Sequence, residues 1–284
     1  MTIAITGATG ALGQLILASL AARDPSAAPV ALARSPERLA QTGVEARRFD
    51  YDDEGSLAPA LRGVETLMLV SSSEVGKREA QHRAVIAAAR EAGVRRIVYT
   101  SLLHADRSPL SLAGEHLATE AALKASGLPH TILRNGWYTE NYTASVPPAV
   151  SHGAFIGSAG QGRIASAARR DYAEAAAAVL AESGHDSRTY ELAGDDAYTL
   201  ADLAAELSRQ SGREIPYVDM PEADYAAALA GAGLPASLAQ AIASYDTGAR
   251  QNALFDDGRA LSRLIGRPTT PLSASIAEAL RQTG

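Results

Sequence analysis

Three glycines near the start of the sequence have a spacing that suits the binding of a phosphate group. Gly7, Gly10 and Gly13 follow a short apolar run over residues 3–5 and form the pattern G-x-x-G-x-x-G. Glycines let backbone N–H groups approach a pyrophosphate, and a helix beginning there adds its positive N-terminal end. The alternative is a tight strand–helix turn that binds no ligand. The residues expected to contact a dinucleotide are Gly7, Ala8, Thr9, Gly10, Ala11, Leu12 and Gly13.

Arg34 ends the second predicted strand, about twenty residues after the glycines, where the type of dinucleotide is decided. An NAD site usually carries Asp or Glu there, which accepts a hydrogen bond from the ribose 2′-OH. Here no carboxylate follows the strand until Glu37. A guanidinium can pair with a 2′-phosphate through charge-assisted, bidentate bonds. The sequence therefore predicts NADP(H) rather than NAD(H), the alternative role of Arg34 being a solvated surface residue.

The chain lacks the proton-transfer pair of typical short-chain dehydrogenases. Those enzymes use Tyr-x-x-x-Lys, but the residues four positions before Lys77 and Lys124, the two lysines of this chain, are Ser73 and Glu120. No catalytic residue is therefore identified. His116 lies on the predicted helix where that pair usually stands, and it is either an acid–base group or a structural histidine.

The missing acid limits which substrates could accept a hydride. A simple ketone becomes a strongly basic alkoxide when it takes a hydride, whereas a quinone becomes a much less basic hydroquinone anion that water can protonate. A cationic dye is simply neutralised. Such acceptors mainly require that the nicotinamide be held at near-attack distance. The sequence thus favours electron-poor, conjugated acceptors, or a protein that binds a dinucleotide without catalysis.

Composition excludes several classes of protein. The 284 residues are 46% hydrophobic and 20% charged, as in ordinary globular proteins, and can form one large domain or two modest ones. The absence of cysteine excludes disulfides and thiolate chemistry, and no metal site is predicted. The net charge of −6 argues against nucleic-acid binding. No apolar run could span a membrane, and no signal peptide is evident, so a cytoplasmic location is expected.

Strand and helix patterns alternate through the first half of the chain. This alternation predicts an α/β protein with a Rossmann-type, doubly wound parallel sheet. Residues 50–52 follow the third strand, and they either lie beside an adenine or start the next helix. The predicted strands cover residues 2–6, 29–33, 44–49, 65–71, 95–100 and 129–133, and the helices 11–23, 54–62, 78–92 and 112–126.

The pattern changes after residue 133. We expect an NADP-binding domain over residues 1–133 and a smaller, mostly helical, substrate-side lobe over 134–284, with about 160–195 returning to the sheet through a helix at 171–183 and a strand at 188–193. Ligands of open α/β sheets bind beyond the carboxyl ends of the strands. A cleft between the two parts is therefore expected there.

Six segments spread over the chain match a known family. They are ITGATG (5–10), LVSSSEVG (69–76), YTSLLHAD (99–106), LRNGWYTENY (133–142), LFDD (254–257) and LIGRPTT (264–270). On these segments the chain resembles the type 2 NADPH:quinone oxidoreductases, in the NmrA-like branch of the atypical short-chain dehydrogenases. The resemblance runs almost from end to end. It implies NADPH as cofactor, a small-molecule quinone as substrate and direct hydride transfer without flavin. It leaves the oligomeric state open.

The resemblance also implies site residues beyond the glycines and Arg34. Arg169 is a further cofactor candidate, with a surface ion pair as its alternative role. The aromatic residues expected near a planar acceptor are Trp137, Tyr138 and Tyr142, unless they pack between the lobes. The other expected cofactor contacts are Ser72, Ser73, Glu74 and Val75 along the cofactor, and Tyr138, Thr139, Glu140, Asn141, Tyr142 and Thr143 towards the nicotinamide. Two other members of this fold class remain as alternatives, a redox sensor without turnover and a reductase of triphenylmethane dyes.

Overall fold

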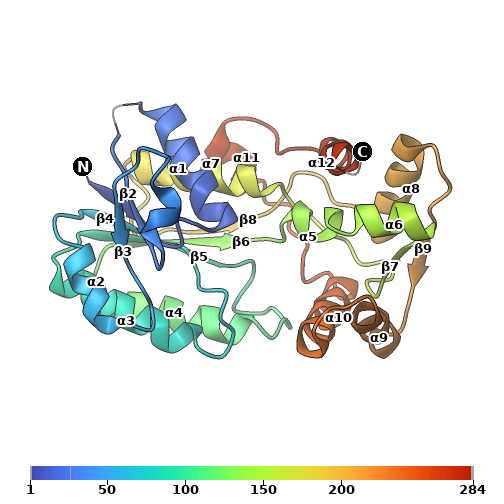
Figure 1. The fold of residues 1–284 in the computed structure, drawn as a ribbon, viewed down its shortest axis with the longest axis horizontal. Helices are drawn as coiled ribbons and strands as arrows, with labels where there is room; N and C mark the ends of the chain where they lie inside the picture. Colours follow the sequence, from blue (N-terminus) through green and yellow to red (C-terminus); the bar gives the residue numbers. More distant parts are fainter. Residues whose placement is uncertain (1, 26, 283–284) are drawn as a thin grey trace.

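A seven-stranded parallel sheet with helices on both faces forms the larger of the two parts of the molecule (Figure 1). The computed structural model describes residues 2–25 and 27–282. The strand order is β3-β2-β1-β4-β5-β6-β8, so the order reverses between β1 and β4. Such a reversal is where doubly wound sheets bind their ligands. The strands are β1 (Ile3–Ile5), β2 (Val30–Ala33), β3 (Ala46–Arg48), β4 (Thr66–Leu69), β5 (Arg96–Leu102), β6 (His130–Asn135) and β8 (Thr189–Leu192).

Helices cover both faces of this sheet, which confirms the predicted Rossmann-type fold. On one face α1 (Ala11–Arg23) packs against α7 (Arg169–Ala181), and α11 (Ala260–Ile265) packs against α7 and β8. On the other face α3 (Arg78–Glu91) lies between α2 (Glu54–Ala60) and α4 (Ala113–Ser126), as Figure 1 shows. A short 3-10 helix, η1 (Pro36–Leu39), follows β2.

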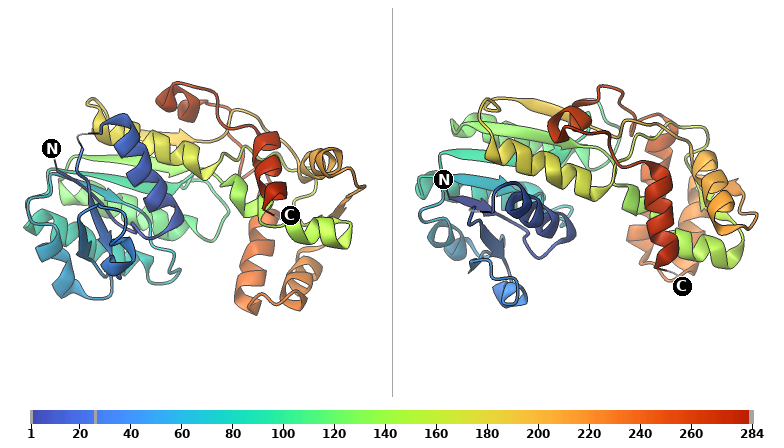
Figure 2. Two further views of the ribbon diagram at one scale, coloured as in Figure 1. Left: turned by 45° about the horizontal axis from the view of Figure 1, so that its top comes forward. Right: turned by 90° about the horizontal axis from the view of Figure 1, so that it is seen from above.

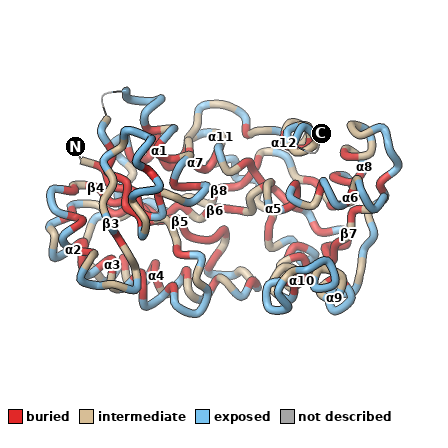
Figure 3. The backbone as a smooth tube through the Cα atoms, viewed as in Figure 1, coloured by how far each residue is buried: buried red, intermediate tan, exposed pale blue. Residues whose placement is uncertain are grey.

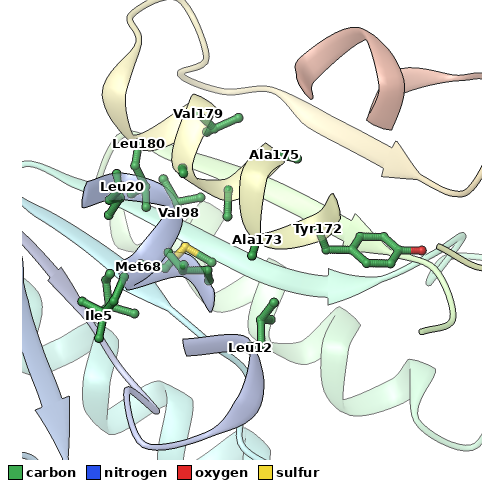
Figure 4. Packing of buried hydrophobic residues seen from close by; sticks show 14 of the residues in the cluster. Ile5, Leu12, Leu20, Met68, Val98, Tyr172, Ala173, Ala175, Val179 and Leu180 are labelled. Carbon is green, nitrogen blue, oxygen red and sulfur yellow. The ribbon is translucent and has the colours of Figure 1, made fainter. Parts of the chain in front are cut away.

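The core of the sheet domain has one apolar layer under each set of helices. Figure 4 shows the first layer, in which Leu12 and Leu20 of α1 and Val179 and Leu180 of α7 meet Met68 and Val98 of the sheet. Several alanines of α7 are fully buried, and their small side chains let α7 lie close to its neighbours. Figure 3 shows how burial follows the strands, while the outer helix faces are exposed. This packing fixes the position of α1, whose N-terminus forms part of the candidate site.

The remaining residues form a second lobe beside the sheet domain (Figure 2). Its apolar core includes Phe155, Leu203 and Ile276. Two three-residue strands, β7 (Phe155–Gly157) and β9 (Tyr217–Asp219), pair in parallel, a feature that the sequence did not predict because such short strands carry little periodicity. The helices of the lobe are α5 (Thr139–Thr143), α6 (Val146–His152), α8 (Leu200–Ser211), α9 (Glu222–Gly231), α10 (Ala236–Arg250) and α12 (Leu272–Arg281).

Candidate dinucleotide site

The glycine turn brings backbone atoms closer together than side chains would allow. Gly7 has a φ of 60°, in the left-handed region that glycine adopts without strain. The N–H of Gly10 donates to the carbonyl of Gly7 at 2.8 Å. A Cβ on Gly13 would lie 2.9 Å from the Cα of Ala8, and closer still to the carbonyl oxygen of Gly7. Glycine at these positions therefore lets α1 start directly against the end of β1.

The N-terminus of α1 is free to receive an anion. Its first four N–H groups have no carbonyl partner within the helix, and the aligned peptide dipoles add partial positive charge. Gly10, the N-cap residue, offers no side-chain cap, and the first turn holds no acidic residue. Nothing in the helix itself therefore competes with a phosphate for these donors, and the turn fits the pyrophosphate of a dinucleotide.

A cavity of about 450 Å³ runs from this turn along the carboxyl ends of β1 to β4. Of the residues predicted from the sequence, those lining the cavity are Gly7, Thr9, Gly10, Ala11, Leu12, Gly13, Arg34, Ser72, Ser73, Glu74, Tyr138 and Arg169. The lining residues beyond that set are Ala33, Phe49, Asp50, Tyr51, Val70, Ser71 and Arg78. Asp50 and Tyr51 thus lie at the edge of the cavity, where the sequence left open whether they meet an adenine. The carboxyl ends of the first four strands all contribute to this one cavity.

Buried polar residues hold the loop that follows β4. The N–H of Ser72 donates to Nε2 of His82 at 3.0 Å, and Nε of Arg78 donates to the carbonyl of Ser72 at 2.7 Å. Glu115 of α4 accepts from Arg78 at 2.9 Å and from the N–H of Gly76 at 2.8 Å. None of Arg78, His82 and Glu115 was predicted from the sequence. A sequence signal existed only for Arg78 and His82, which stand four residues apart and so share one helix face.

Burial determines the protonation of His82. Removal from water lowers its pKa from 6.5 to about 3, and the charge of nearby Arg78 acts in the same direction. The imidazole is therefore neutral, and it accepts the Ser72 N–H through Nε2 while Nδ1 lies 3.0 Å from Oγ1 of Thr119. A neutral His82 thus fixes the backbone at the start of the loop.

His116 occupies a similar environment. Its Nδ1 lies 2.7 Å from the hydroxyl of Tyr99, and both side chains are buried. Desolvation lowers the pKa of His116 to about 3 and raises that of Tyr99 above its usual value. His116 does not line the cavity. Of the two roles considered from the sequence, this geometry fits the structural one.

Arg34 forms an ion pair across the cavity. Its Nη1 lies 3.1 Å from Oε1 of Glu74, which comes from the loop after β4. The second oxygen of Glu74 lies 3.3 Å from Nζ of Lys77, and this ammonium group also lies 3.3 Å from Asp52. Gln81 donates to Asp52 at 2.9 Å. A guanidinium suited to a 2′-phosphate is thus already paired with a carboxylate.

Tyr138, which follows β6, and Arg169, the first residue of α7, also line the cavity. The guanidinium of Arg169 lies 4.8 Å from the centroid of the Tyr138 ring. The backbone N–H of Arg169 donates to both carboxylate oxygens of Glu140, at 2.9 and 3.0 Å. Burial raises the pKa of Tyr138, while the side chain of Asn135 acts against this shift. Oδ1 of Asn135 is buried and has no hydrogen-bond partner among the described residues. A buried acceptor without a partner among the described residues therefore lies at the carboxyl end of β6.

The other predicted site residues lie outside the lining of this cavity. The hydroxyl of Tyr142 donates to buried Asp246 at 3.2 Å, and Trp137 packs against Tyr245 with ring centroids 5.3 Å apart. Both belong to the core of the second lobe or contact it, which is the packing role that the sequence left open for them. Ala8, Thr139 and Thr143 are buried, Glu140 is half-buried, and Val75 and Asn141 are exposed. As cofactor or substrate contacts, these residues stay predictions.

The described part of the chain has neither a metal site nor a membrane-spanning helix. No group of three or more histidine and acidic side chains is placed to hold a metal ion. Among residues 2–25 and 27–282, no helix has the length and apolar character needed to cross a membrane.

The fold and the glycine turn together define a dinucleotide-binding protein. Residues 7–183 match the family model described as NAD(P)H-binding, and the chain belongs to this family. It is 56% identical to quinone oxidoreductase 2 of Escherichia coli, over 97% of both chains. This similarity confirms the relationship to type 2 quinone oxidoreductases that the six sequence segments predicted.

Solved structures show the same fold over nearly the whole chain. The NADPH-dependent quinone oxidoreductase of Escherichia coli, complexed with NADPH, has a TM-score of 0.94 at 56% identity, with 98% of this chain and 99% of that one covered. The triphenylmethane reductase of Citrobacter sp., complexed with NADP(H), has a TM-score of 0.93 at 35% identity, with 98% and 100% covered.

Proposed function

We propose that this protein is an NADPH:quinone oxidoreductase that transfers hydride directly, without flavin. The observation that carries the proposal is the open N-terminus of α1 behind the glycine turn, facing a cavity that also holds Arg34. The high identity to a quinone oxidoreductase over nearly the full length supports the reaction. A cytoplasmic location is part of the same proposal, because NADPH serves as a reductant there.

The residues of the cavity fit the parts of NADPH. The N–H groups at the start of α1 would hold the pyrophosphate, and Arg34 would hold the 2′-phosphate. Tyr138 follows β6, which lies on the other side of β1 from β2 and Arg34, so Tyr138 and nearby Arg169 are suited to the nicotinamide. When bound, NADPH supplies a hydride from C4 of its nicotinamide ring. The protein's own contribution is to orient this ring and the acceptor.

Proton supply fits a quinone better than a simple ketone. The two histidines that are buried in the described part of the chain, His82 and His116, are neutral and engaged in hydrogen bonds. Neither lines the cavity. A hydroquinone anion is weakly basic and takes its proton from water, so the reaction does not need a positioned acid.

Arg34→Asp tests the cofactor assignment. Loss of a charge-assisted bond to the 2′-phosphate should weaken NADPH binding by about 10- to 100-fold, while NADH binding changes little. Isothermal titration calorimetry with each dinucleotide gives the ratio of the NADPH and NADH affinities. Arg38→Asp, the same charge change at an exposed position of η1, serves as the matched control. An unchanged preference in Arg34→Asp would refute the role of Arg34.

A quinone panel tests the reaction itself. The absorbance of NADPH should fall after addition of a benzoquinone or naphthoquinone, faster than without enzyme. Tight NADPH binding with no excess oxidation over the whole panel would instead support a redox sensor. The likeness to triphenylmethane reductase makes a cationic triphenylmethane dye the second acceptor to include. Turnover of the dye alone would assign the protein to that reaction.

A further inference from the structure

The pairing of Arg34 with Glu74 has consequences for cofactor choice. Both residues line the cavity, yet they come from different elements, the end of β2 and the loop after β4. A 2′-phosphate that binds Arg34 must meet the carboxylate already 3.1 Å from that guanidinium. Two anions cannot share one guanidinium without repulsion, so the phosphate and Glu74 compete for it.

We propose that Glu74 sets the cofactor preference of this protein by competing with the 2′-phosphate for Arg34, and that Lys77 weakens this competition by holding Glu74. The inference rests on the proposed function, since it takes Arg34 as the phosphate ligand. Glu74 opposes the binding of NADPH, and Lys77 favours it without contacting the phosphate. Glu74 and Lys77 are thus specificity-determining and positioning residues, respectively.

The contacts of Glu74 explain how the exchange works. Its Oε1 faces Arg34, whereas Oε2 lies 3.3 Å from Nζ of Lys77 and 3.4 Å from Nε2 of Gln81. A carboxylate displaced from Arg34 therefore keeps a cation and an amide donor on its other oxygen. Asp52, 3.3 Å from the same ammonium group, helps to hold Lys77 in place. The displaced Glu74 is not left unpaired, so the phosphate can take Arg34.

NADH meets a different balance. It has a 2′-OH in place of the phosphate, so Arg34 can keep its bond to Glu74. The hydroxyl can also donate to the carboxylate of Glu74, much as it donates in NAD sites to an Asp or Glu at the end of the second strand. Glu74 therefore acts in opposite directions on the two cofactors. It opposes NADPH through competition and tolerates or assists NADH.

The side chains of this cluster are partly exposed, so the effects are moderate and depend on salt. Arg34 and Lys77 are 68% and 61% exposed, and Glu74 is 33% exposed. Exposed ion pairs change binding constants by about two- to fivefold. Screening reduces the effect as ionic strength rises, because the Debye length shortens.

Binding of adenosine fragments tests the proposal without turnover. Adenosine 2′,5′-bisphosphate carries the phosphate that distinguishes NADPH, and 5′-AMP lacks it. Calorimetry at low salt should show that Glu74→Gln binds the bisphosphate about threefold more tightly and 5′-AMP no more tightly. Lys77→Gln should bind the bisphosphate about threefold more weakly. Both changes should shrink at high salt.

The double variant Glu74→Gln/Lys77→Gln shows whether Lys77 acts through Glu74. If it does, removing Lys77 has little further effect once Glu74 is neutral. A full Lys77 effect in the Glu74→Gln background would overturn this assignment. The matched controls are Glu79→Gln, on the exposed side of α3, and Lys124→Gln, the other lysine of the chain. Neither control should change the ratio of the two affinities.

Arg34→Gln separates the two levels of the proposal. If this variant loses the preference for the bisphosphate while Glu74→Gln is unchanged, the phosphate site stands and the role of Glu74 is refuted. If Arg34→Gln keeps the preference, the phosphate site itself is elsewhere and the proposed cofactor assignment is wrong.

Discussion

Gly13→Ala should remove most of the protein's affinity for NADPH and also destabilise the fold. The added Cβ would lie 2.9 Å from the Cα of Ala8 and still nearer to the carbonyl oxygen of Gly7, so backbone must move on one side of the contact. A shift of α1 would misplace the N–H groups that we propose to hold the pyrophosphate, for which we expect a loss of about 10- to 100-fold in affinity. The free energy of unfolding should fall by about 1–3 kcal/mol, as in other overpacked sites.

Two measurements separate the effects of this substitution. Calorimetric titration with NADPH gives the affinity, and urea unfolding without cofactor gives the stability. Gly231→Ala is the matched control, because a Cβ at this exposed end of α9 would meet nothing within 4 Å. It should leave both quantities nearly unchanged. Full NADPH affinity in a folded Gly13→Ala protein would show that the close approach of α1 is not needed for binding.

The parts of the site that sequence reasoning found are those encoded by local spacing. The glycines form a strand–turn–helix unit within a dozen residues, and α1 begins at Ala11, as the pattern predicted. Arg34 directly follows β2, so its place at the sheet edge follows from the strand prediction alone. Such features depend on neighbours in the sequence, and a single sequence shows them.

The contacts that sequence reasoning missed join segments that are far apart in the chain. Glu115 reaches Arg78 across two helices, and Glu74 meets Arg34 forty residues away in the chain. No periodicity encodes such a pairing, since it depends on how α3, α4 and the loop after β4 pack together. The same limit explains why the sequence did not reveal the contact of Tyr142 with Asp246, which lies on α10 in the second lobe. The burial of Tyr142 there depends on the tertiary fold, which a local aromatic motif does not reveal.

Acid should destabilise this protein more than its carboxylates alone would suggest. His82 and His116 have pKa values of about 3 in the folded protein, against 6.5 for an exposed histidine. The unfolded chain therefore binds protons that the folded chain cannot, and stability falls as the pH drops from 6.5 towards 3. Between pH 7 and pH 5 each imidazole should lower the free energy of unfolding by about 2 kcal/mol, and the two together by about 4 kcal/mol.

Asp246 works in the opposite direction over the same pH range. Desolvation raises its pKa from 3.8 to about 6, so the folded protein takes up a proton that the unfolded chain binds only at lower pH. This uptake should raise the free energy of unfolding by about 1 kcal/mol between pH 7 and pH 5. The net loss is therefore about 3 kcal/mol, which urea unfolding at the two pH values can measure.

Single substitutions assign the loss to the two buried imidazoles. Replacing His82 or His116 with glutamine removes one titrating group, so each variant should lose about 2 kcal/mol of the pH dependence, whatever its stability at pH 7. Comparing slopes rather than absolute stabilities removes the cost of an imperfect side-chain fit. His152→Gln, at an exposed position of α6, should keep the full dependence. If the slope between pH 7 and pH 5 is the same in all three variants, the buried histidines are not the origin of the acid sensitivity.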